Sequence, residues 1–366
     1  MDKGNLRRVL ISTFIPIFAA FLVGAIMILA IGEDPILTYR VMVEKSLLNW
    51  DGLLKTLHLA SPLILTGLAI AITFKANIFN MGVEGGAILG GFFAGIAGFT
   101  FNGLPAPLHI FLCLLTGAVV GMLYALIPAI LKAYYKMDEM VVTLMLNYAV
   151  VVLVTFLSQG VFRDPSSGYV ATYAIYDSAM FTKILGTNLT YFFFISMVVF
   201  VMLYILFKKT KLGYEITAIG KNTEFAEAMG MKVRQTIIKI MLISGALSGL
   251  AGAGYLMSEK FRFTLDFSGN PGLGWDGMLI ALLGGHDPIG VLIASIFYAA
   301  LKTGSEYIGI YTNVPKDIVA IIQGILILFL SVKFISARLG LVKKFKNSRT
   351  KRNKNGETKK VEEEIS

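Results

Sequence analysis

The stretch LISTFIPIFAAFLVGAIMILAI, residues 10–31, contains 22 residues and no charge. An α-helix rises about 1.5 Å per residue, so about 20 apolar residues cross the hydrocarbon core of a bilayer. Further long apolar runs follow, and the charged residues, 15% of the sequence, gather in short clusters between them. A soluble core does not use many separate runs of this length. The sequence therefore predicts an all-α, polytopic membrane protein.

About ten transmembrane helices are expected. The first run follows three basic residues, but it is longer than the apolar region of a signal peptide, so we expect it to remain as the first span. The stretch 272–302 also admits a second interpretation, a re-entrant element followed by one full helix. The predicted spans are 10–31, 54–74, 85–101, 108–131, 140–160, 190–207, 240–257, 272–285, 288–302 and 316–334.

Lysine and arginine gather in three places: before the first span, in the loop 208–239, and beyond residue 342. Basic loops favour the cytoplasmic side of a membrane, and an even number of spans puts all three regions there. We therefore expect a cytoplasmic N-terminus at 1–9, a transmembrane domain at 10–335 and a cytoplasmic tail at 336–366. The tail is basic and polar, which is typical of a disordered segment that contacts anionic lipid.

Polar side chains at membrane depth are costly, so each is a candidate for the path of a solute. Five residues are predicted to line such a path: Asn80, Glu84, Asn147, Trp275 and Asp276. We expect at least one of the first three to face the cavity. The alternative is a hydrogen bond between helices for the amides, and a charge at a helix entry for Glu84.

Glycines recur at four-residue spacing in two of the predicted spans, at Gly86 and Gly90 and at Gly245 and Gly249. This spacing lets helix backbones approach closely. Tight packing is one interpretation. Helices that slide or break around a central path are the other.

Signatures of catalysis are absent from the sequence. Gly220-Lys221 is followed by Asn222, where a Walker-type phosphate loop has Ser or Thr, and the three histidines form no HExxH pair. We expect no enzyme activity, no metal site, no cofactor and no nucleic-acid partner for this chain. Energy from ATP and Mg²⁺ would have to come from another subunit.

The loop 208–239 is predicted to contain a short helix between Gly220 and Gly230. Asn222 or Thr223 can cap its start, and Gly230 can end it. Phe225, Ala226 and Met229 would give this helix an apolar face for docking on a partner. The alternative is an ordinary solvated connector.

Three motifs resemble one family. They are GYEITAIG at 213–220 with Asn222, Ala226 and Gly230 after it, FNMGVEG at 79–85, and GMLIALLGGHDPIG at 277–290. In this order they resemble the permeases of ABC importers that serve branched-chain amino acids, ribose-type sugars and nucleosides. The stretch NMGVEG and the long segment before 190 look most like bacterial nucleoside permeases. Met at 81 and Gly at 86 depart from the common pattern.

The resemblance implies a type II ABC importer-like fold in a bacterial cell membrane, with both termini cytoplasmic. It implies a second permease subunit, identical or related, two cytoplasmic ATPases, and an extracellular binding lipoprotein or periplasmic binding protein. The expected solute is a nucleoside, moved inward. A ribose-type sugar permease, or an ion-coupled secondary transporter with Glu84 as its ionisable group, remains an alternative. The residues expected to couple the permease to its ATPase are Gly213, Glu215, Gly220, Asn222, Phe225, Ala226, Met229 and Gly230.

Overall fold

The computed structural model describes residues 18–184, 186–268, 271–315, 317–322 and 324–325. The chain divides into two units, residues 33–316 and the two terminal stretches 1–32 and 317–366. In the terminal unit, a helix at Phe18–Ala30 lies within the first predicted span. The start of that span, most of the predicted span 316–334 and the tail 336–366 lie outside the described residues.

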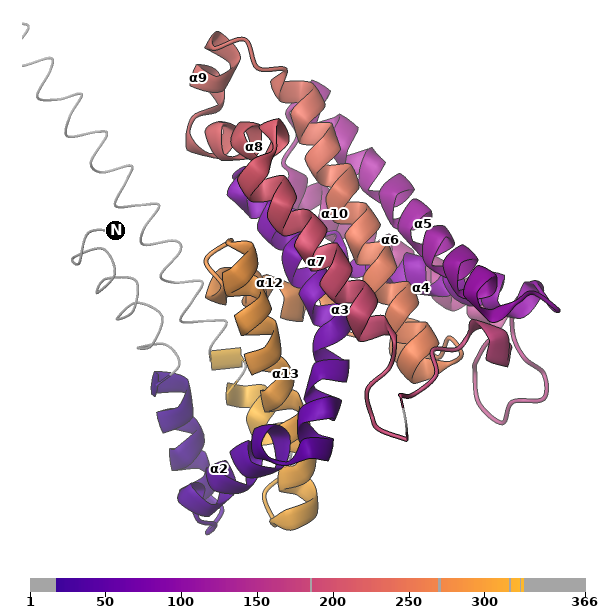
Figure 1. Ribbon diagram of the computed structural model, residues 1–366, viewed down its shortest axis with the longest axis vertical. Coiled ribbons are helices and arrows are strands. Elements are labelled where there is room, and N and C mark those ends of the chain that lie inside the picture. The colour runs from indigo at the N-terminus through magenta and orange to yellow at the C-terminus, as the bar shows by residue number, and fades with distance from the viewer. Residues whose placement is uncertain (1–17, 185, 269–270, 316, 323, 326–366) are drawn as a thin grey trace, which may run out of the picture. The chain divides into compact units, whose positions relative to one another are not determined.

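The described residues contain seven helices that are long and apolar enough to cross a membrane (Figure 1). They confirm seven of the predicted spans, most with ends moved by a few residues, while α10 begins seven residues earlier and α13 ends nine residues later than predicted. The seven are α3 (Trp50–Lys75), α4 (Val83–Thr100), α5 (Ala106–Tyr135), α6 (Glu139–Gln159), α7 (Phe192–Lys209), α10 (Val233–Tyr255) continued by η3 (Leu256–Lys260), and α13 (Pro288–Tyr311). Among the described residues, β-pairing is limited to isolated bridges.

Helix starts follow from side chains that accept hydrogen bonds from free backbone N–H groups. Asn49 caps α3 through the N–H of Asp51, and Asp138 caps α6 through two N–H groups of its first turn. Asp287 caps α13, whose first residue is Pro288. Proline suits that position because its missing N–H would have no partner in the helix.

The helices α4, α5 and α10 pack backbone against backbone at glycines. A Cβ on Gly249 would overlap the carbonyl oxygen of Gly117, and one on Gly245 would overlap that of Gly121. A Cβ on Gly90 would overlap the Cα of Gly249. The four-residue glycine spacing therefore serves close packing of these helices.

The segment between α10 and α13 is not one continuous helix. Among the described residues between η3 and α12 the single turn α11 (Leu265–Ser268) is helical, and the helix α12 (Leu273–Leu283) has only 11 residues. About 16 Å of helix is too short to span a bilayer, so the full span predicted at 272–285 is wrong. Glycine at both ends stops this helix early, and the alternative of a partial element followed by the full helix α13 describes the region.

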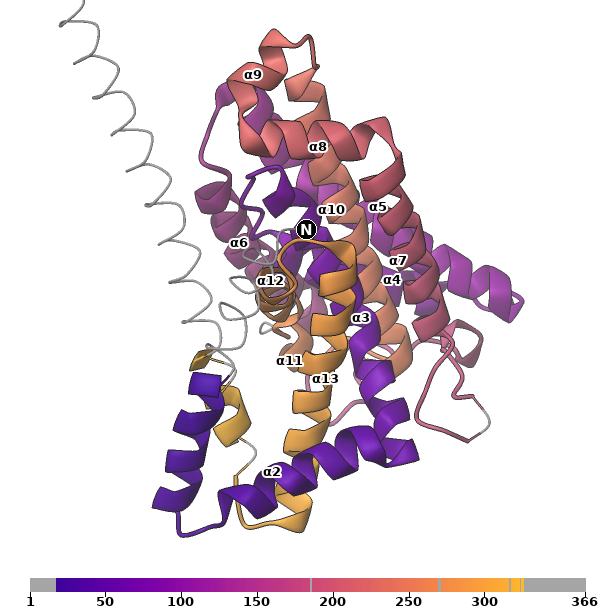
Figure 2. The same cartoon turned by 60° about the vertical axis from the view of Figure 1, so that its left-hand side comes forward.

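Two shorter helices, α2 (Pro35–Val43) and the π-helix η1 (Glu44–Leu48), precede α3, and a 3₁₀ turn, η2 (Asp177–Ala179), lies between α6 and α7. We call the end of the spans where α3 begins the α2 end. At the opposite end, α7 leads into α8 (Lys211–Lys221) and α9 (Thr223–Ala228). We call this the α9 end. Here α8 runs across the ends of the spans (Figure 2).

Candidate functional site

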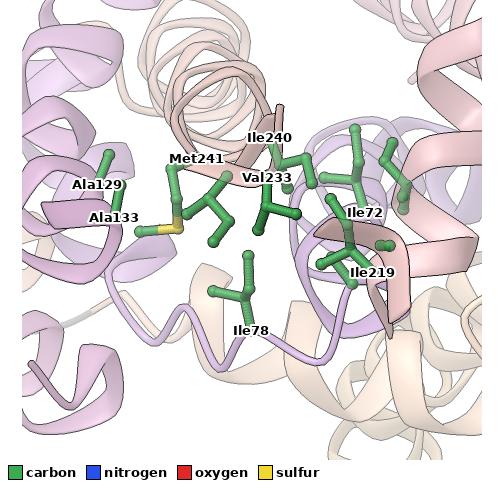
Figure 3. Packing of buried hydrophobic residues seen from close by; sticks show 12 residues of the cluster. Ile72, Ile78, Ala129, Ala133, Ile219, Val233, Ile240 and Met241 are labelled. Atoms are coloured by element: carbon green, nitrogen blue, oxygen red, sulfur yellow. The ribbon is translucent and has the colours of Figure 1, made fainter. Parts of the chain in front are cut away.

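A cluster of twelve buried residues holds α8 and α9 against the spans (Figure 3). Ile72 comes from α3, Ala129 and Ala133 from α5, and Ile240 and Met241 from α10. The remaining members are Ala76, Ile78, Ile216, Ile219, Ala226, Val233 and Ile237. Burial of this apolar surface makes the loop 208–239 a fixed part of the domain, in contrast to a solvated connector.

The helix α9 begins and ends where the sequence predicts. The Asn222 side chain accepts a hydrogen bond from the N–H of Phe225 at 2.9 Å, so Asn222 is the cap. Thr223 instead donates to the carbonyl oxygen of Ile219. Gly230 has a φ of 78°, a backbone conformation that glycine adopts without strain, and the helix stops before it.

The predicted docking face of α9 is wrong in one residue. Ala226 is fully buried in the cluster, whereas Phe225 is 62% and Met229 is 65% exposed. Residues four apart lie on one side of a helix, and a residue next to them points about 100° away. The exposed apolar surface therefore consists of Phe225 and Met229, and Ala226 faces this protein's own core.

Three other predicted coupling residues hold α8 in place. A Cβ on Gly213 would overlap backbone oxygens at the end of α7, and one on Gly220 would overlap the carbonyl oxygen of Lys75. Glu215 accepts a hydrogen bond from the hydroxyl of Thr236 on α10 at 2.9 Å. These contacts connect α8 to α7, α3 and α10, so displacement of α8 acts on three spans.

Beside α9 lies a cavity of about 420 Å³. Its wall is basic along the ends of α5 and α10, at Lys132, Lys136 and Arg234, and acidic along α9, at Glu224 and Glu227. Residues of the buried cluster also line this space, so the cavity lies between α9 and the ends of α5 and α10.

The ionic contact between α7 and α13 also lies at the α9 end. Lys208 donates to the Asp287 carboxylate at 2.6 Å. Burial works against ionisation of Asp287, but the hydrogen bond and charge of Lys208 outweigh it and hold the pKa of this carboxyl below its usual range. Next to it, burial lowers the pKa of His286 to about 4, and the charge of Lys75 acts in the same direction.

Glu84 binds the start of the half helix α12. Its carboxylate accepts a hydrogen bond from the N–H of Gly272 at 2.9 Å and another from the N–H of Gly274. The side chain is buried, with 3% exposed. A carboxylate here satisfies free N–H groups and complements the positive end of the helix dipole. Glu84 therefore connects α4 to α12.

The two amides are also buried and bonded to protein atoms. Asn147 accepts from the N–H of Gly85 at 3.0 Å and from the hydroxyl of Tyr124 at 2.8 Å. Asn80 donates to the hydroxyl of Ser244 at 2.9 Å. Hydrogen bonds of this kind were the alternative interpretation for the two amides. A cavity-facing role for Asn80, Glu84 or Asn147 stays a prediction.

Asp276 lies in a second polar contact, between α12 and α13. Its carboxylate accepts from the hydroxyl of Tyr298 and from the ammonium of Lys302, both at 2.5 Å. The neighbouring Trp275 is 36% exposed. The sequence analysis named Asp276 and Trp275 as candidates for the solute path but did not name Lys302. A lysine within the apolar run 288–311 is also a polar group at membrane depth, so the same criterion applies to it.

Seven long apolar helices in the described part of the chain, with a capped helix packed across one end of them, define a polytopic membrane protein. Residues 52–331 match the family described as the permease component of the branched-chain amino acid transport system. The match covers most of the chain, and the chain belongs to this family of ABC importer permeases.

Three relatives cover nearly the whole chain. The nucleoside ABC transporter permease protein NupB of Lactococcus lactis is 33% identical over 91% of this chain and 93% of its own length. The guanosine ABC transporter permease protein NupP of Bacillus subtilis is 32% identical over 90% of this chain and 96% of its own. A glucose ABC transporter permease protein of Haloferax volcanii is 31% identical over 86% and 85%.

Proposed function

We propose that this permease moves a nucleoside inward through a bacterial cell membrane. The observation that carries the proposal is the similarity over about nine-tenths of the chain to two permeases named for nucleosides and guanosine. A separate cytoplasmic ATPase supplies the energy, so this chain performs no chemistry itself.

The exposed pair Phe225 and Met229 is the surface on which that ATPase docks. Phe225 and Met229 are apolar, lie on one side of a capped helix, and are mostly exposed. Closing of the ATPases moves α9, and the contacts of Gly213, Glu215 and Gly220 pass the motion to the spans. A second permease subunit completes the path, and a binding lipoprotein delivers the solute from outside.

The α9 end is the cytoplasmic side, together with both termini. Single cysteines at positions 3, 221 and 350 test this orientation with a thiol reagent that does not cross membranes. The native Cys113 is buried, so it gives little background. Labelling occurs only after the membrane is opened. Strong labelling of intact cells at any of the three positions contradicts this topology.

Two rivals differ in solute or energy source. The relative from Haloferax volcanii, named for glucose, is nearly as similar as the nucleoside relatives, so a sugar is the second candidate. An ion-coupled transporter would need a free ionisable group along the path. The Glu84 carboxylate is instead engaged by two backbone N–H groups, which disfavours it as that group.

Uptake of labelled guanosine by cells that express the permease, its ATPase and its binding protein tests the proposal. Excess unlabelled adenosine should compete, and excess ribose or glucose should not. An ATPase variant unable to hydrolyse ATP is the control and should abolish uptake. Competition by glucose alone would assign a sugar, and uptake that persists with the inactive ATPase would assign a secondary transporter.

A further inference from the structure

The helix α13 carries two charges within an otherwise uncharged span. Lys302 and Glu306 are four residues apart, so they lie on one side of the helix. Lys302 pairs with Asp276 on α12, and Glu306 pairs with Lys55 on α3. The two ion pairs thus join α13 to the spanning helix α3 and to the short helix α12.

More charge gathers around Tyr255, the last residue of α10. This phenol lies within electrostatic range of the carboxylates of Glu259, Asp276 and Glu306, and the ammonium of Lys260 lies 5.9 Å from its ring centre. Glu259 also pairs with His58, one turn along α3 from Lys55. These ionic residues, Lys55, Glu259, Asp276, Lys302 and Glu306, together with the exposed Trp275 that precedes Asp276 in the chain, are called the charged face below.

The charged face reaches well inside the membrane. Lys302 lies nine residues from the end of α13 at Tyr311, which is about 14 Å along the helix, and Glu306 lies about 8 Å from it. With Tyr311 taken as the edge of a hydrocarbon core about 30 Å thick, Lys302 lies near the middle of that core.

These side chains are paired but not enclosed. The side chain of Lys302 is 35% exposed and that of Glu306 is 47% exposed. Charges at this depth are costly against lipid and normally face a water-filled cavity or another charged group. An exposed ion pair in the middle of a span therefore indicates water on that side of α13. The exposed Ile293 lies nine residues before Lys302, on the opposite side, where lipid suits it.

From this placement we propose that the charged face lines the solute path and contacts the nucleoside directly. Trp275 is exposed beside Asp276 and offers a flat surface on which a base can stack. The carboxylates of Glu259 and Glu306 accept hydrogen bonds from ribose hydroxyls, and Lys302 donates to base edges or ring oxygen. The inference rests on the proposed function for the identity of the solute.

The ion pairs suit a path along which the solute binds weakly and moves on, in contrast to a high-affinity binding site. Each charge already has a partner in the protein, so a passing solute exchanges one hydrogen bond for another and leaves no bare charge behind. Conduction needs binding that is weak enough for release. Asn80, Glu84 and Asn147, by contrast, are buried and hold helices together.

Cysteine accessibility tests the position of water. Glu306→Cys, and the milder Ser305→Cys beside it, should react with a water-soluble thiol reagent in membranes, and excess guanosine should slow the reaction at least threefold. Ile293→Cys is the matched control on the opposite side of α13 and should react slowly, with no effect of guanosine. Lack of reaction at both 305 and 306, or reaction that guanosine does not slow, would overturn the proposal.

Transport tests the contacts. Trp275→Ala should raise the KM for guanosine about tenfold or more, and Trp275→Phe should restore most of it, because a ring remains for stacking. Lys302→Met should also raise the KM for guanosine about tenfold. Lys183→Met, the same change at an exposed lysine outside the spans, should change this KM less than twofold. Unchanged KM in Trp275→Ala and Lys302→Met would refute the charged face while wild-type uptake of guanosine upholds the proposed function. Failure of the wild-type protein to take up guanosine would refute the proposed function instead.

Discussion

Replacement of Phe225 by serine should weaken ATPase docking without unfolding the permease. Full burial of a phenylalanine side chain contributes about 1.5–3 kcal/mol. Since 62% of Phe225 is exposed, docking that buries this exposed part contributes about 1–2 kcal/mol, which is about 5- to 30-fold in affinity. Titration of purified permease in nanodiscs with its ATPase measures that ratio.

The matched control is Tyr169→Ser, an equally exposed aromatic residue in the segment between α6 and α7 at the α2 end, which should leave docking unchanged. Ala226→Glu provides the contrast. It places a charge among buried apolar residues, so it should lower the melting temperature of the permease alone, before any partner is added. Equal ATPase affinity for Phe225→Ser and the wild type would refute α9 as the docking element. An unchanged melting temperature for Ala226→Glu would refute the buried position of that residue.

Three further predictions concern stability. Gly249→Val should destabilise the domain by about 3 kcal/mol through backbone overlap and lower its melting temperature, whereas Gly168→Val, which has open space around it, should not. Glu84→Ala should cost about 2–6 kcal/mol because two buried N–H groups lose their acceptor, and an unchanged melting temperature would show that water replaces the carboxylate. His286 has a pKa of about 4 in the folded protein against an ordinary 6.5, so only the unfolded chain takes up a proton in that window, and stability should fall by up to about 3 kcal/mol as the pH drops from 6.5 to 4. His286→Asn, which tolerates the positive φ there, should flatten melting temperature against pH, and an unchanged slope would assign the effect to another group.

The spans could be predicted because each depends on local composition. A run such as 108–131 has to be a helix in lipid whatever surrounds it. The caps of α9 were equally local, since Asn222 and Gly230 act on their own backbone. The spacing of Gly245 and Gly249 left packing and sliding both open, and the backbone contacts in the structure are those of close packing.

The parts that failed depend on contacts between distant segments. Ala226 and Phe225 are neighbours with similar polarity, and only the cluster at the ends of α3, α5 and α10 decides which is buried. Glu84 accepts a hydrogen bond from Gly272, 188 residues later, and sequence alone does not show this contact. The sequence left a full span and a re-entrant element open at 272–302, and composition alone could not decide between them.

The helix α10 starts three residues after Gly230 and ends at Tyr255, beside the charged face. Its 23 residues make a rod about 35 Å long, locked by backbone contacts to α4 and α5 for much of its length. Because its glycines lie against the backbones of α4 and α5, these three helices form one packed block. In the proposed coupling, movement of α9 would therefore displace this block together and reach the charged face through α10. Substitutions that alter this coupling are expected at the two ends of α10, because a Cβ at Gly245, Gly249 or Gly252 would overlap neighbouring backbone atoms.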